Sequence, residues 1–131
     1  MMTNAIGIAL SGLNSATQRL NASASNIANA FTSGSLEEGG QAPYTPLDTT
    51  SKADAAGGVQ TQIIPRNNPV AVAYDPNSPH ANAEGFVGGP NVDLAEEAVN
   101  LKLAELSYKA NLNTIKVAGE IFDELLDAVD D

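Results

Sequence analysis

The sequence has no cysteine and no tryptophan, and only 5% of its 131 residues are aromatic. Without cysteine there can be no disulfide framework, no thiolate catalysis and no zinc–thiolate site. Small residues supply much of the 43% apolar content, so a thick globular core would be hard to build. We therefore expect one modest domain, or long elements that pack on other chains.

Long apolar runs are also missing. No stretch of 18 apolar residues occurs, so we expect no segment that spans a membrane. The amino terminus, MMTNAIGIALSGLNSA, lacks the basic residues that open a secretory signal peptide. The protein is expected either to stay in the cytoplasm or to leave by a route that cleaves no signal.

Positive charge is scarce, and the net charge is −10. This balance argues against nucleic acid as a partner. Residues 1–36 contain one arginine and no acid, whereas residues 92–131 contain ten acids and three bases. The first third of the chain is nearly uncharged and the last third is acidic.

Catalytic patterns are absent as well. No motif typical of a phosphate-binding loop, a serine hydrolase or a zinc protease occurs. His80 is the only histidine and stands without neighbouring ligands, and Asp127, Asp130 and Asp131 are typical of a solvated acidic tail. We expect no enzyme, no cofactor and no metal site.

What the chain does have is helical periodicity at both ends. Over residues 4–31, apolar side chains recur with alternating steps of four and three, as in the seam of a coiled coil. Thr3 is the expected N-cap. The other face carries Ser and Asn with Arg19 as its only charge, and these are weak helix formers. We expect a helix that needs association to become ordered. The seam consists of Ile6, Leu10, Leu13, Thr17, Leu20, Ala24, Ile27 and Phe31.

The middle of the chain, residues 32–91, reads as loop and short strands. Residues 32–58 show no clear period and predict an extended or mobile loop. Alternating residues in GVQTQII and PVAVAY predict two strands, joined by PRNNP as a small hairpin. A further short strand is expected at Phe86–Val87.

Residues 92–131 predict one long helix. Asp93 is the expected N-cap, with Glu96 three residues later as in a capping box. Two apolar stripes lie nearly opposite each other, so one partner helix can cover only one of them. The first stripe is Val92, Ala95, Val99, Leu103, Leu106, Ala110, Val117 and Ile121. The second is Leu94, Ala98, Leu101, Tyr108, Leu112, Ile115, Phe122, Leu126 and Val129.

Together these patterns predict a mainly α fold. Long N- and C-terminal helices (1–31 and 92–131) form a coiled-coil-like pair, and a small β-hairpin and loop insert (32–91) lies between them. Each helix needs more burial than this chain supplies, so order is expected to depend on assembly. This is the outline of a subunit of a helical or tubular assembly.

Two stretches carry a family resemblance. RLNASASNIANAFT resembles the N-terminal motif of bacterial flagellar rod and hook proteins, and YDPNSPHANAEGFVGGPNVDLAEEAVN followed by SYKAN is similar to the proximal rod members of that family. The sequence departs from the family's pattern in TPLDTTSKAD, where basic and β-rich residues are usual, and at Ala98, where methionine is usual.

The resemblance implies a structural subunit of the flagellar basal body. Such proteins leave uncleaved through the flagellar type III export apparatus and polymerise, with copies of themselves and other rod proteins, into a hollow rod across the periplasm. Their terminal helices form coiled-coil layers around the channel, and the rod transmits torque to the hook.

The periodicity and the resemblance together predict the residues at subunit interfaces. Asn26 and Asn29 are i,i+3 neighbours and are expected to present their amides together to other subunits. The full set is Ile6, Leu10, Leu13, Leu20, Asn21, Ala24, Asn26, Ile27, Ala28, Asn29, Pro90, Asn91, Val92, Asp93, Val99, Leu106, Tyr108, Ala110 and Asn111.

A second function stays open at this point. A cytoplasmic helical adaptor, or an export chaperone for axial subunits, would also be acidic and carry amphipathic helices. Such a protein would remain inside the cell and bind its client in a small soluble complex.

Overall fold

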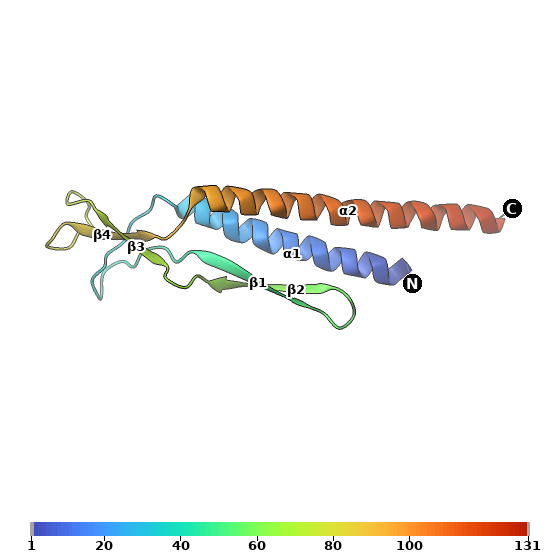
Figure 1. The fold of residues 1–131 in the computed structure, drawn as a ribbon, viewed down its shortest axis with the longest axis horizontal. Helices are drawn as coiled ribbons and strands as arrows, with labels where there is room; N and C mark the ends of the chain where they lie inside the picture. Colours follow the sequence, from blue (N-terminus) through green and yellow to red (C-terminus); the bar gives the residue numbers. More distant parts are fainter. Residues whose placement is uncertain (1, 131) are drawn as a thin grey trace.

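The computed structural model describes residues 2–130. Two long helices, α1 (Met2–Asn29) and α2 (Leu94–Asp130), lie side by side and run in opposite directions (Figure 1). Four strands lie between them in the sequence. This confirms the expected architecture of two terminal helices with a small antiparallel insert. The Thr3 cap is wrong, because α1 already begins at Met2 and Thr3 lies inside its first turn.

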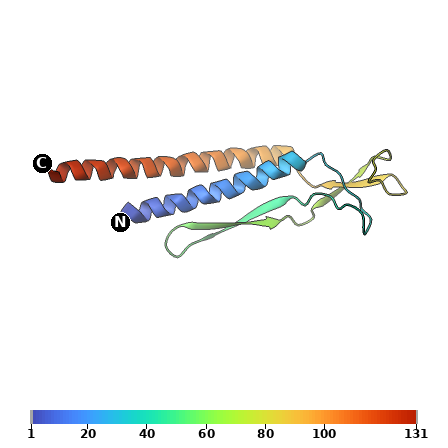
Figure 2. The ribbon, with the colours of Figure 1, turned by 180° about the vertical axis from the view of Figure 1, so that it is seen from behind.

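The start of α2 agrees with the prediction. The Asp93 carboxylate accepts hydrogen bonds from the backbone N–H of Ala95 (2.9 Å) and of Glu96 (3.2 Å), as an N-cap does. Glu96 and Glu97 add negative charge at the positive end of the helix dipole. With 37 residues, α2 extends about 55 Å and continues well beyond the amino-terminal end of α1 (Figure 2).

The first hairpin consists of β1 (Leu47–Ala53) and β2 (Val59–Pro65), paired antiparallel with Ala53 opposite Val59. It lies along α1 (Figure 1). The Ser15 and Thr61 hydroxyls are 2.6 Å apart, and the Ser11 hydroxyl accepts from the Val59 N–H at 3.1 Å. The prediction of a loop throughout 32–58 is therefore wrong. Strand β1 has no alternating apolar residues, because most of it stays exposed.

The second hairpin consists of β3 (Val70–Tyr74) and β4 (Phe86–Pro90). The Phe86–Val87 strand is confirmed, but the predicted pairing of the second and third strands with each other is wrong. Pro65 and Pro69 cannot donate to a ladder, and the connector between them is tied to other segments. The Arg66 N–H donates to the Pro46 carbonyl and the Asn91 N–H donates to the Pro69 carbonyl.

The buried apolar side chains are small. They are Ala9, Ala16, Ala22, Val87, Ala104 and Ala118. The largest fully buried side chains are instead Glu97, Asn26 and Pro46. The chain therefore has little apolar core, and a polar cluster occupies the place where the two helices and the first hairpin meet.

Candidate functional site

The polar cluster is centred on Asn26, whose side chain is completely buried. Its Nδ2 donates to the Leu47 carbonyl (2.8 Å) and to Glu97 Oε1 (2.9 Å). Its Oδ1 accepts from the Leu47 N–H (2.8 Å) and from the Tyr44 hydroxyl (3.0 Å). An asparagine amide has two donor and two acceptor positions, so every one of them is used within this chain.

Arg66 supplies the positive charge of the cluster. Its Nη2 lies 2.8 Å from Glu97 Oε1, its Nε donates to Asp48 Oδ1 at 2.9 Å, and its Nη1 donates to the Asn91 carbonyl at 2.9 Å. Burial opposes the charge, but the hydrogen bonds and negative charges of Asp48 and Glu97 outweigh that effect and raise the pKa of the Arg66 guanidinium. We call Tyr44, Asp48, Arg66, Glu97 and Asn26 the junction cluster.

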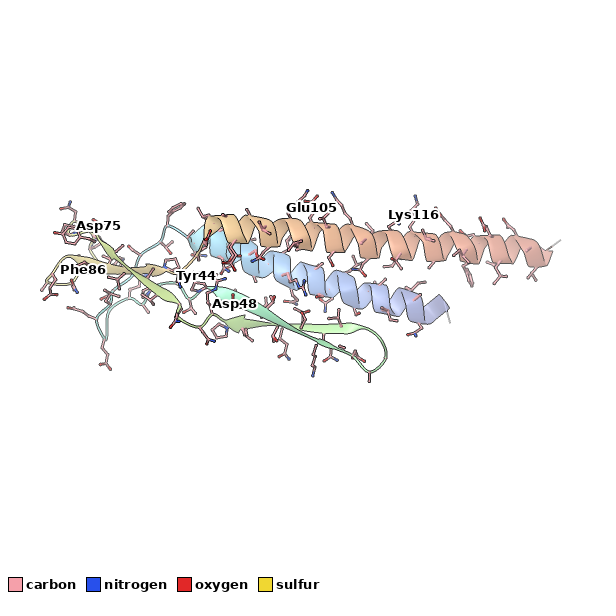
Figure 3. All side chains as sticks on the ribbon, viewed as in Figure 1. Tyr44, Asp48, Asp75, Phe86, Glu105 and Lys116 are labelled. Atoms are coloured by element: carbon pink, nitrogen blue, oxygen red, sulfur yellow. The ribbon has the colours of Figure 1, made fainter. Side chains whose placement is uncertain are left out.

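The junction cluster connects segments that are far apart in sequence. It joins the end of α1, the start of β1, the connector after β2 and the first turn of α2, and Figure 3 shows Tyr44 and Asp48 at this meeting point. Within residues 4–130, no buried side-chain nitrogen or oxygen is left without a partner. A buried charge costs several kcal/mol unless it is paired, so these contacts fix one arrangement of the four segments.

The two helices approach each other through small side chains. Ala9 and Ala16 of α1 and Ala104 and Ala118 of α2 are buried. At Gly12, an added Cβ would stand 2.3 Å from Asn111 Oδ1, so the backbone of α1 lies against that side chain. Because small residues fill the contact, the larger apolar residues remain on the outside of the pair.

The predicted seam of α1 lies beside this contact and not in it. Leu10 is 54% exposed, Leu20 41% and Phe31 88%. An apolar groove of about 230 Å³ runs between the helices, with Leu20 and Thr17 on one wall and Tyr108 and Ala104 on the other. The lining of this groove is almost entirely apolar, and its volume suits one or two apolar side chains.

The outer surface of α2 is also apolar. Val99, Leu103 and Leu106 of the first predicted stripe are each more than half exposed. Residues of the second stripe, including Tyr108, Leu112 and Leu126, are also exposed. Since α1 covers mainly small and polar residues of α2, most large residues of both stripes remain exposed, whereas Leu101 and Ile115 are partly covered.

Charged residues on α2 lie beside these stripes. Glu105 accepts hydrogen bonds from Lys109 and Lys102, and these bonds lower the pKa of the Glu105 carboxyl. Lys116 Nζ lies 3.8 Å from Glu120 Oε1. Such exposed pairs contribute little to stability, so these lysines stay available to a partner.

The remaining predicted interface residues fall into two groups. Those with side chains at the surface are Asn21, Ala24, Ala28, Asn91, Asp93 and Ala110. Those partly or fully covered within the chain are Ile6, Leu13, Ile27, Asn29, Pro90, Val92 and Asn111.

The Asn26 prediction needs correction. We expected the Asn26 and Asn29 amides to face other subunits together, but Asn26 is fully engaged inside the chain, and Asn29 donates to the Ser25 carbonyl of its own helix at 3.0 Å. The sequence analysis also missed the role of Arg66 and of Glu97. The sequence did contain one indication that Glu97 faces inward. Glu97 begins a line of residues at helical spacing that continues through Leu101 and Ala104 toward α1.

The described residues expose apolar surfaces along both helices. None of the described helices is long and apolar enough to cross a membrane. Among residues 2–130, no three side chains of metal-binding type cluster together. The surface instead presents apolar helical faces that a stable monomer would normally bury.

Comparison with known proteins matches both ends of the chain. A family described as "Flagella basal body rod protein" matches residues 6–34, and one described as "Flagellar basal body rod FlgEFG protein C-terminal" matches residues 83–128. These two segments contain most of α1 and of α2.

Individual proteins match over nearly the whole length. The flagellar basal-body rod protein FlgC of Escherichia coli O6:H1 is 38% identical over 124 residues, covering 88% of this chain and 90% of the relative. FlgC of Salmonella typhimurium is 39% identical over the same coverage. FlgC of Aquifex aeolicus is 30% identical over 127 residues, covering 95% of each chain.

Proposed function

The chain belongs to the FlgC family of flagellar basal-body rod proteins, and on this premise we propose that it forms part of the proximal rod. In that role it polymerises with copies of itself and with other rod proteins into a hollow shaft that crosses the cell envelope and transmits torque. The observation that carries the proposal is the exposed apolar surface along both helices, which lie in the two segments that match rod proteins.

Coiled-coil-like packing between subunits follows from this surface. The groove beside Leu20 and Tyr108 can accept an apolar side chain of a neighbouring helix, and the exposed Val99–Leu106 face offers a second surface for contact. A helix pair with two free apolar sides can be covered by neighbours on both, which a closed tubular layer requires. We treat residues 1–31 and 92–131 as the layer-forming parts and residues 32–91 as the insert that holds them together.

Assembly is also proposed to complete the ordering of the chain. Residues of low charge and weak helix propensity fill α1, and such a helix is marginal without tertiary contacts. A chain of this kind suits passage in an unfolded state through the type III export apparatus without cleavage. Ordering then accompanies incorporation.

Fractionation tests the proposal. The chain, carrying a small C-terminal epitope, is expressed in its own organism, and basal bodies are extracted with detergent and purified. We expect the chain in the basal-body fraction at a fixed ratio to other rod proteins. A chain found only in a small soluble complex in the cytoplasm would favour an export chaperone and contradict the rod assignment.

A further inference from the structure

The outer edge of β4, on the side away from β3, is closed within the chain. The Gly88 N–H donates to the Gly34 carbonyl at 2.9 Å, and the Gly34 N–H donates to the Gly88 carbonyl at 2.7 Å. The Phe86 N–H donates to Asn82 Oδ1 at 2.8 Å, and the Phe86 carbonyl accepts from the Asn82 N–H at 2.9 Å. Pro90, the last residue of β4, has no N–H to offer. This edge of the second hairpin therefore has no free backbone donor.

The register of the second hairpin determines which backbone groups of β3 point away from β4. The Asp75 N–H, directly after β3, donates to the Gly85 carbonyl at 2.9 Å. Hydrogen-bonded and non-hydrogen-bonded pairs alternate along an antiparallel ladder. The odd-numbered residues of β3 therefore bond to β4, whereas the backbone N–H and C=O groups of Val70, Val72 and Tyr74 point outward.

These outward groups form an open edge. Among residues 2–130, none of them has a hydrogen-bond partner. All five residues of β3 are also exposed, Val72 by 64% and Tyr74 by 68%, and the second hairpin lies at the end of the molecule away from the C-terminus (Figure 1). An isolated two-stranded hairpin is marginal in water, and a row of unpaired backbone groups is a template for another strand. We call the outward groups of Val70, Val72 and Tyr74 the free edge.

We propose that the free edge pairs antiparallel with the free edge of a second copy of this chain, with the two Val72 residues opposite each other. The inference goes beyond the proposed rod function and does not depend on it. In this register Val70 of each copy lies opposite Tyr74 of the other. Every outward N–H of one copy then meets an outward carbonyl of the other, and the two hairpins join into one antiparallel sheet.

The side chains along the free edge also suit a second copy. Tyr74 of one copy would lie beside Val70 of the other, and aromatic side chains next to β-branched ones stabilise adjacent strands. Phe86 packs edge-on against Tyr74 in the same hairpin, with ring centroids 5.5 Å apart, and would extend the apolar face. Asp75 would lie opposite Pro69, so the pairing brings no two acids face to face.

The symmetry of this contact separates it from the proposed rod. Two copies related by a two-fold axis run in opposite directions, whereas copies repeated along a rod all run the same way. The paired state therefore belongs to the free protein. It covers an edge that would otherwise recruit strands of other chains, and it has to open before a copy enters the rod.

Single cysteines test the register, since the chain has no other thiol. The Cα atoms of a directly opposite, hydrogen-bonded pair lie about 5.5 Å apart, which is within disulfide range. We expect Val72→Cys to form disulfide-linked dimers of the purified full chain in a glutathione buffer. Val70→Cys should not link to itself, because the two copies of that residue stand more than about 10 Å apart, but should link when mixed with Tyr74→Cys. Equal dimer yields from Val72→Cys alone and Val70→Cys alone would overturn the proposal.

Sedimentation of the purified chain at increasing concentration tests the contact without a disulfide. An edge this short predicts a weak dimer, with a Kd on the order of 10–100 μM. Val72→Pro removes an outward N–H and no bond to β4, so it should weaken the dimer at least roughly tenfold. The control, Ala53→Pro, is exposed and faces outward on β1, since the next residue, Asp54, donates inward to the Gly58 carbonyl.

The control should change the Kd less than about twofold, and circular dichroism checks that both variants keep their helices. A monomer at every concentration up to about 500 μM, or equal dimerisation of the two proline variants, would contradict the pairing. Both experiments use the free protein, whereas the rod assignment is tested in basal bodies, so failure of one leaves the other standing.

Discussion

The two ends of the helix pair differ in how fully their side chains find partners within the chain. At the end where α1 meets the strands, Asn26, Arg66 and Glu97 use their hydrogen-bonding groups within the chain. At the other end, α2 extends past the amino-terminal end of α1 and exposes Phe122, Leu125 and Val129 to solvent. The first end is satisfied within one molecule, whereas the second leaves large apolar side chains uncovered.

This difference explains how one short chain can be both a defined subunit and a polymer-forming one. The junction cluster fixes the direction in which both helices leave the insert. In the proposed rod, the free faces would meet neighbours at a geometry that is already set. A chain with free faces along its whole length would have no internal contact that fixes the direction of its helices.

The largest effect is expected from placing charge on the outer face of α2. In Val99→Asp plus Leu106→Asp, both replaced side chains are more than half exposed, so the free energy of unfolding of the isolated chain should change by less than about 1 kcal/mol. Incorporation into basal bodies should be lost, because neighbouring helices would bury the new charges. Immunoblots of purified basal bodies measure how much of the variant is incorporated.

The matched control for the Val99/Leu106 variant adds two negative charges outside α2. Ala55→Asp plus Ala83→Asp alters exposed turns of the two hairpins and should leave motility and incorporation near the original level. Normal incorporation of the Val99/Leu106 variant would remove this face from the interface.

A large loss of stability is expected at the junction cluster. Glu97→Ala removes the buried carboxylate that Arg66 and the Asn26 amide share, although Arg66 keeps Asp48 and Asn26 keeps the Leu47 carbonyl, and it should lower the free energy of unfolding by about 3 kcal/mol. Glu97→Gln keeps an acceptor and should cost less, roughly 1–3 kcal/mol. Urea unfolding followed by circular dichroism measures both. If the two variants had equal midpoints, the charge of Glu97 would have no part in holding this end together.

A smaller effect is expected where the helices approach most closely. Gly12→Leu must displace Asn111 and should destabilise the chain by about 1–3 kcal/mol. At Gly7 on the same helix an added Cβ meets no atom within 4 Å, so Gly7→Leu should be neutral or slightly stabilising. The same urea titration compares them, and equal midpoints would show that α1 and α2 are not in contact at Gly12.

The smallest effect is expected near the C-terminal end of α2. Gly119→Ala has open space around it and gains up to about 1 kcal/mol of helix propensity. Because the segment that follows extends past the amino-terminal end of α1, the gain should raise the helical signal at 222 nm while the urea midpoint hardly moves. A clear shift of the midpoint would mean that the end of α2 unfolds together with the junction cluster.

Parts of this fold could be predicted because short-range sequence patterns determine them. The alternation of three and four residues predicts both helices, and Asp93 predicts the start of α2. Alternating valines predict β3. The pairing of strands could not be predicted, because Pro65 and Pro69 suit a hairpin turn as well as the anchored connector that forms.

The junction cluster and the face of α1 escaped prediction for different reasons. Asn26 and Glu97 are 71 residues apart, and no local pattern relates them. On α1, the large residues Leu10, Leu13 and Leu20 indicate the seam, yet the chain packs through Ala9, Gly12 and Ala16. Small residues allow close approach, and this leaves the leucines for contacts that a single chain does not contain.

The most direct test of the account asks whether the outer face of α2 becomes covered on assembly. Since the chain has no cysteine, Leu106→Cys provides a single reactive thiol, and Ala104→Cys provides a buried control on the same helix. Maleimide labelling of this chain, read by mass spectrometry, should be fast at position 106 in the free protein and at least roughly tenfold slower in purified basal bodies, with position 104 slow in both. Equal labelling of position 106 in the two states would contradict the account.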